Sequence, residues 1–209
     1  MSRPEVGSSP RIAPGRAADI GARNAVITRV LGLAAGGRPQ NVFTTLARHP
    51  KLFRRWLRFA ATLMPGGRLP RRETELVILR VAHNTGSVYE WSQHERIAQT
   101  AGLTAAEVER VRSTSDGSAW TAREQLILRA VDELHSSHTI SDDLWVPLRE
   151  ALSQVEVIEL CMLIGHYEML AMTLNALHVQ PDPPPSRAGL RVMRVLGRMR
   201  SRSQRRSTR

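Results

Sequence analysis

Residues 73–104 read ETELVILRVAHNTGSVYEWSQHERIAQTAGLT. Before Gly86, apolar residues recur at helical spacing, which predicts a helix over residues 71–84. After Gly86, Ser87 and Glu90 have the three-residue spacing of a capping box, in which a hydroxyl and a carboxylate accept hydrogen bonds from the first N–H groups of a helix. The stretch therefore predicts two consecutive helices, 71–84 and 87–100, separated by a turn at Gly86.

The same helix-start pattern is repeated along the chain. Further capping-box pairs, each ahead of a helix-like stretch, are Thr104/Glu107, Thr121/Glu124 and Ser153/Glu156. The other expected helices cover residues 20–34, 41–48, 50–63, 105–113, 122–136, 142–152 and 154–178. Because no segment shows the alternation of a convincing strand, the sequence predicts an all-α fold of about eight or nine helices.

The single cysteine, Cys161, limits the possible chemistry. One thiol excludes an internal disulfide and any zinc site built from several thiolates, and it fits a reducing compartment. The N-terminus has basic residues but no apolar segment of the signal-peptide kind, and no apolar run approaches the roughly eighteen residues of a membrane span. We therefore expect a cytoplasmic protein in which Cys161 is a core residue.

Charge and composition divide the chain into three parts. The formal net charge is +11, but residues 186–209 contain nine Arg and no acidic residue, so the rest carries only +2. We expect a disordered segment over 1–18, a helical domain over 19–180, and a Pro-rich linker with an Arg-rich tail over 181–209. The tail is either a solvated disordered segment or a basic amphipathic helix that binds an anionic membrane or a nucleic acid.

A row of polar residues accompanies the turn at Gly86. His83, Ser87, Glu90 and His94 follow one another in steps of four, three and four, and would share one face of a continuous helix. Glu90 and His94, one helical turn apart, are able to form a carboxylate–imidazole pair that moves protons near neutral pH. The alternative is a capping box at Ser87 and Glu90, with His94 as an ordinary polar residue of the helix.

Other candidate residues lie further along the chain. His166 and Tyr167 fall within the very apolar stretch 154–178, where polar side chains need partners, so they form either a satisfied buried pair or part of a pocket wall. His135 and His138 have no neighbouring ligands in the sequence, and we predict no metal site. The sequence contains no glycine-rich phosphate loop and no nucleophile elbow.

Residues 41–56, 69–104 and 165–180 together resemble the carboxymuconolactone decarboxylase family, which shares its fold with alkylhydroperoxidase D. The likeness covers about residues 20–180 and is most specific in ETELVILR, GSVYEWSQH and AGLT. It implies an all-α domain that forms homo-oligomers, with a site near a subunit interface and no organic cofactor.

The resemblance also assigns roles by position. The peroxidase branch carries a Glu, two cysteines and a His, which fall here on Glu75, Ser87, Glu90 and His94. Because both thiols are absent, thiol-dependent peroxide reduction is not expected. The resemblance implies instead a decarboxylase-like, cofactor-independent proton transfer by Glu75, Glu90 and His94 on a small organic acid or lactone. The residues expected to line the substrate pocket are Ser87, Tyr89, Trp91, His83, Arg80, His166 and Tyr167.

Two other functions stay open on the sequence. One is a catalytically silent oligomeric scaffold whose basic tail binds an anionic membrane or a nucleic acid. The other is a peroxidase-like antioxidant role, which the missing thiol pair disfavours. The enzyme is the favoured interpretation because Glu75, Glu90 and His94 are together suited to moving protons.

Overall fold

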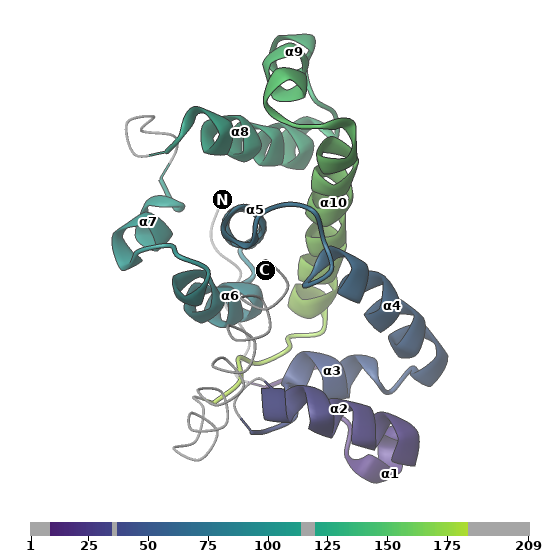
Figure 1. The fold of residues 1–209 in the computed structure, drawn as a ribbon. Coiled ribbons are helices and arrows are strands. Elements are labelled where there is room, and N and C mark those ends of the chain that lie inside the picture. Colours follow the sequence, from purple (N-terminus) through teal and green to yellow (C-terminus); the bar gives the residue numbers. More distant parts are fainter. Residues whose placement is uncertain (1–8, 35–36, 114–119, 184–209) are drawn as a thin grey trace, which may run out of the picture. The chain divides into compact units, whose positions relative to one another are not determined.

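The structure, a computed structural model, describes residues 9–34, 37–113 and 120–183 (Figure 1). Within these residues it contains ten α-helices and no strand, which confirms the all-α prediction. The helices are α1 (Ala17–Ile20), α2 (Ala22–Ala34), α3 (Asn41–Leu46), α4 (Pro50–Leu63), α5 (Arg71–Asn84), α6 (Val88–Thr100), α7 (Ala105–Arg110), α8 (Ala122–Ser137), α9 (Asp142–Ala151) and α10 (Gln154–Ala176). The one helix beyond the predicted eight or nine is the four-residue α1, which is too short to give a periodic sequence signal.

The chain divides into two compact units. The larger contains residues 57–178, and the smaller contains residues 10–56 together with the segment that begins at Val179. The boundary falls within α4. The sequence had placed residues 19–180 in one helical domain, and most of the Arg-rich tail (184–209) lies outside the described residues.

Helix α5 is the central helix of the larger unit and packs against α6, α8 and α10 (Figure 1). All residues from Glu73 to Ala82 are buried, because neighbours surround the helix on every side. Its polar side chains are paired with those of α8: Glu73 receives hydrogen bonds from Arg123, and Arg80 donates two to Asp132. Buried ions need such partners, so these pairs set the register of α5 against α8.

The smaller unit includes part of the segment that was expected to be disordered. The N–H of Gly15 donates to the Thr44 carbonyl at 3.1 Å, and Arg48 Nε donates to the Ala13 carbonyl at 2.8 Å. A Cβ at Gly15 would lie 2.3 Å from Ile20 and 2.9 Å from the Thr44 oxygen, so only glycine allows this approach. The expectation for residues 1–8 lies outside the described residues.

Three of the four predicted capping boxes are present. The side chains of Thr104, Thr121 and Ser153 each accept a hydrogen bond from the N–H three residues later. Ser87 precedes α6 but makes no such bond. The capping-box interpretation of Ser87 and Glu90 is therefore wrong, and these two side chains need another explanation.

Helix α10 buries one side in the larger unit and exposes an apolar stripe on the other. It is the one helix among the described residues that is long and apolar enough to cross a membrane, although half of its most apolar window is buried within the protein. A buried core helix has the same composition, so this test alone is weak evidence of a membrane span. The exposed large apolar side chains of α10 are Val155, Ile158, Met162, Met169 and Met172.

Candidate functional site

A hydrogen bond between Glu75 and His94 joins α5 to α6. Glu75 Oε2 lies 2.7 Å from His94 Nδ1, and Glu75 Oε1 lies 2.6 Å from Arg71 Nη2. Glu75 is completely buried and His94 is 7% exposed. A carboxylate at Nδ1 fixes the orientation of the imidazole and, in the neutral ring, places the proton on Nδ1 and the lone pair on Nε2. The arrangement provides an oriented base in a dry environment.

Tyr167 of α10 lies against this pair. Its ring contacts the His94 ring edge-on, with 5.3 Å between centroids and 88° between planes. Burial, together with the nearby charges of Glu75 and Glu90, raises the pKa of Tyr167 well above its usual value, so the phenol stays protonated. His166 packs edge-on against Tyr167 on one side and against Phe59 on another, and burial lowers the pKa of His166 to about 4.

Glu90 is a buried carboxyl without a charged partner. Only 2% of it is exposed, and within the described residues neither of its oxygens has a hydrogen-bond partner of good geometry. Burial raises the pKa of Glu90 to about 8; the neighbouring Ser87 hydroxyl acts in the opposite direction, and the charge of Glu168 adds to the rise. Glu90 is therefore a neutral acid at pH 7. His94 is hydrogen-bonded to Glu75 and not to Glu90, its neighbour one turn before.

A small cavity of about 290 Å³ opens beside Ser87. Ser87, His83 and Trp91 line it, so it holds three of the residues expected in the pocket wall. Arg112 supplies a cation: its guanidinium carbon lies 3.8 Å from the centre of the Trp91 ring, and its side chain lines the same cavity. Its Nε also lies 3.1 Å from Glu109 Oε2, and the acidic residue Glu95 lines the cavity as well. Stacking on Trp91 holds the guanidinium in place, as cation–π contacts do.

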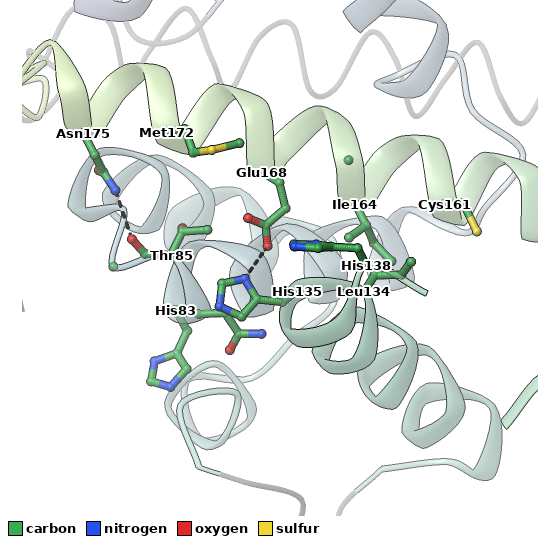
Figure 2. Close-up of a pocket in the computed structure, with 13 residues that line it drawn as sticks. His83, Thr85, Leu134, His135, His138, Cys161, Ile164, Glu168, Met172 and Asn175 are labelled. Carbon is green, nitrogen blue, oxygen red and sulfur yellow. Dashed lines mark hydrogen bonds and ion pairs between the residues drawn. The ribbon is translucent and has the colours of Figure 1, made fainter. Parts of the chain in front are cut away.

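A larger cavity of about 760 Å³ lies on the other side of the turn at Gly86, between that turn, α8 and α10 (Figure 2). His83 and Gly86 line both cavities. In the larger one, His135 Nδ1 lies 2.7 Å from Glu168 Oε1, which makes a second carboxylate–imidazole pair. Glu75, Glu90 and His94 line neither cavity.

The remaining predicted residues lie apart from these walls. Tyr89 is buried in the protein, with 4% of it exposed. Arg80 donates two hydrogen bonds to Asp132 and two more to the carbonyls of Val111 and Ser113, so four of its five N–H groups are occupied. Arg80 thus has a structural position that explains its burial.

Sequence reasoning missed Arg112, His135 and Glu168 as a set of site residues. Arg112 lies twenty-one residues beyond Trp91, and Glu168 lies thirty-three beyond His135. No short-range spacing reveals such contacts. The only local signal was the pair of histidines at 135 and 138, which was set aside for lack of neighbouring ligands. Within the described residues no group of three or more His, Cys, Asp and Glu side chains is arranged to hold a metal ion.

Part of the chain matches a family model. Residues 50–133 match the model of the carboxymuconolactone decarboxylase family. The matching segment runs from α4 into α8, and it includes Glu75, Ser87, Glu90 and His94 but not His135 or Glu168. A search of curated protein sequences found no significant match.

Solved structures show that the chain has the all-α fold of alkylhydroperoxidase D-like proteins. A peroxidase-related protein with an alkylhydroperoxidase core from Ralstonia eutropha JMP134 superimposes with a TM-score of 0.74 at 17% identity, covering 83% of this chain and 92% of that one. A peroxidase-related protein from Silicibacter sp. TM1040 gives 0.72 at 15% identity, with coverage of 87% and 93%. A cysteine-to-alanine variant of the debrominase Bmp8, in complex with 2,3,4-tribromopyrrole, gives 0.72 at 16% identity, with coverage of 89% and 98%.

Proposed function

We propose that this protein is an enzyme that transfers protons to and from a small organic acid or lactone, using Glu75, Glu90 and His94. The observation that carries the proposal is the state of Glu90. A carboxyl that is buried, lacks a charged partner and titrates near pH 8 is a poised acid, and burial without function would only destabilise the fold.

The Glu75–His94 pair supplies the complementary base. With Nδ1 bonded to Glu75 at 2.7 Å, the neutral His94 ring accepts a proton at Nε2 and the adjacent carboxylate stabilises the cation that forms. A proton donor and a proton acceptor therefore lie one helical turn apart: Glu90 holds a proton at pH 7, and His94 is able to take one. Such a pair suits a reaction in which a proton leaves one position of a molecule and enters another.

The small cavity favours a carboxylate-bearing substrate. Arg112 provides the cation and the Trp91 ring provides an apolar wall. Glu95 also lines the cavity, and Ser87, whose hydroxyl neighbours the Glu90 carboxyl, connects the lining to Glu90. A volume of about 290 Å³ suits a molecule of the size of a lactone acid. The family is named for the decarboxylation of such a compound, which leaves a delocalised carbanion that must be protonated.

Peroxide reduction is not proposed. Ser87 and Glu90 occupy the two thiol positions of the peroxidase branch, and Cys161 is the one thiol of the chain. Burial raises the pKa of Cys161 and so lowers its thiolate fraction. A single thiol without a resolving partner does not complete a catalytic cycle of that kind.

The test is proton exchange. Carboxymuconolactone and simpler γ-lactone acids are incubated with the protein in D₂O, and deuterium entry and CO₂ release are followed by NMR. We expect exchange or decarboxylation with the native chain, and a loss of at least a hundredfold in Glu90→Gln and His94→Gln. Arg112→Gln should raise KM more than it lowers kcat.

Glu150→Gln is the matched control, because Glu150 is exposed. Equal rates for all four variants and the native chain would refute the assignment, and no turnover across the lactone acids would favour the silent scaffold.

A further inference from the structure

The larger cavity contains an acid–base pair that the function proposed above does not use. His135 near the end of α8 and Glu168 in the middle of α10 are joined at 2.7 Å, and their side chains are 36% and 20% exposed. Unlike Glu75 and His94, they are open to a molecule in the cavity. Both residues lie outside the segment that matches the family model.

The orientation of the His135–Glu168 pair determines which ring nitrogen of His135 is available to a ligand. Glu168 accepts from Nδ1 of His135, so a neutral ring carries its proton there and its lone pair on Nε2. Figure 2 shows Nε2 at the edge of the ring that faces away from Glu168. An oriented lone pair of this kind is available to accept a hydrogen bond from an O–H group of a bound molecule.

The lining around the pair contains both polar and apolar side chains. Polar groups from the end of α5 and from α10 include His83, Asn84 and Asn175, and the apolar side chains include Leu134, Ile164 and Met172 (Figure 2). A volume of about 760 Å³ lies within the usual range for a small-molecule pocket. Such a lining suits a compact molecule that has both a hydrogen-bonding group and apolar surface.

Helix α8 ends at this cavity. His138 has φ 61° and ψ 17°, a left-handed cap conformation in which histidine is enriched among residues other than glycine, and its N–H donates to the Leu134 carbonyl. The same residue lines the cavity.

The charges of the wall select the protonation state of the ligand. No Lys or Arg is present among the described residues that line the cavity, while Glu168 brings a negative charge. A permanent anion would therefore meet repulsion without a fixed cation to balance it. An uncharged molecule with an acidic O–H group meets no such penalty, and its O–H is able to donate a hydrogen bond to Nε2 of His135.

We infer that this cavity binds uncharged molecules of the phenol or enol class, and that Nε2 of His135, oriented by Glu168, accepts a hydrogen bond from their O–H group. The inference does not depend on the proposed function, because it involves none of Glu75, Glu90 and His94.

Binding of three probes tests the inference. p-Cresol has an acidic O–H, toluene has the same ring without it, and benzoate is a permanent anion of similar size. At pH 8 we expect p-cresol to bind at least tenfold more tightly than either of the others by calorimetry. In protein labelled with ¹⁵N-histidine, p-cresol should move the Nε2 signal of His135, as expected for a ring nitrogen that accepts a hydrogen bond, and toluene should not.

Substitutions locate the site. His135→Gln should remove the preference for p-cresol over toluene, and Glu168→Gln should reduce it at least fivefold. His49→Gln, the same change at an exposed histidine of the smaller unit, should keep it. The inference is overturned if p-cresol and toluene bind equally, if benzoate binds best, or if His135→Gln keeps the preference. If a variant does not fold, an unmoved His135 signal in the native protein at saturating p-cresol overturns it just as directly.

Discussion

Glu75 Oε2 lies 2.7 Å from His94 Nδ1, so one hydrogen bond joins the centre of α5 to the middle of α6. His94→Ala removes the partner of a completely buried carboxylate oxygen. We expect this change to lower the free energy of unfolding by about 2–4 kcal/mol, because a buried charged group left without its partner loses most of its compensation. Urea denaturation at pH 7 measures the effect.

His49→Ala is the control for that prediction. His49 is exposed, and its ring accepts one long hydrogen bond, from the Leu52 N–H at 3.4 Å, so the same truncation should lower the free energy of unfolding by no more than about 1 kcal/mol. If His94→Ala and His49→Ala shift the urea midpoint equally, the hydrogen bond contributes nothing to stability, and the orienting role of Glu75 loses its support.

Glu90 predicts an unusual dependence of stability on pH. Its pKa is raised to about 8 in the folded chain, against 4.5 for an ordinary Glu. Between these values the folded state holds a proton that the unfolded state has released, so each rise in pH favours unfolding by about 1.4 kcal/mol per unit. Glu90→Gln cannot titrate. We therefore expect this variant to become progressively more stable than the native chain from about pH 5 to pH 8 in urea titrations.

The pKa of Glu156 is shifted in the opposite direction to that of Glu90, so stability depends on pH with the opposite sign. Hydrogen bonds from Ser153 and Arg123 lower the pKa of Glu156 to about 2, so its contribution to stability is complete above about pH 4.5 and is lost as the pH falls towards 2. The difference in stability between Glu156→Gln and the native chain should accordingly shrink only on the acid side.

For Glu90, parallel stability curves of Glu90→Gln and the native chain between pH 5 and pH 8 would contradict the burial argument.

Ser87 and Thr121 predict different results for the same kind of substitution. The Thr121 side chain caps α8, so Thr121→Ala should cost about 1 kcal/mol of stability. Ser87 precedes α6, but its hydroxyl is buried without a hydrogen-bond partner of good geometry in the described chain. Ser87→Ala should therefore be neutral or slightly stabilising. Thermal unfolding of the two variants compares them; an equal loss in both would mean that Ser87 caps its helix in solution.

The exposed stripe on α10 predicts that copies of this chain associate. Val155, Ile158, Met162, Met169 and Met172 follow steps of three, four, seven and three, the spacing of a helix–helix seam. A charge placed in such a seam opposes its burial. We expect the native chain to be oligomeric by light scattering, and Ile158→Glu to shift it towards monomer.

Val146→Glu is the matched control for the seam. Val146 is nearly as exposed as Ile158, at 59% against 65%, but it lies on α9. It should leave the mass in solution unchanged. A native chain that is monomeric at about 50 μM, or equal masses for both variants, would remove the α10 seam from consideration.

Much of the helical framework could be predicted from the sequence because its signals are local. The predicted starts of the helices at Pro50, Arg71, Ala105, Ala122 and Gln154 agree with or lie within one residue of the observed ones, since a capping residue acts on N–H groups only two or three positions away. The family motif led to Glu75, Ser87, Glu90 and His94 for the same reason: all lie within twenty residues of one another.

Which of these side chains touch was decided by packing. Spacing allowed either a bond between Glu90 and His94 or a capping box at Ser87 and Glu90, yet α5 brings Glu75 to Nδ1 and leaves Glu90 buried and neutral. Arg80, expected near a substrate, is held by Asp132 because α8 lies alongside α5. Each outcome depends on which helix lies next to which, and periodicity within one helix contains no information about that.

The contrast has one physical reason. Helix starts, turns and apolar faces depend on short-range hydrogen bonds and on the 3.6-residue period, and both are written in neighbouring residues. The pKa of Glu90, the cation of Arg112 beside Trp91 and the pairing of His135 with Glu168 depend on burial and on contacts between residues twenty or more positions apart. Those exist only once α5 is enclosed by α6, α8 and α10, when water has been removed and distant helices meet.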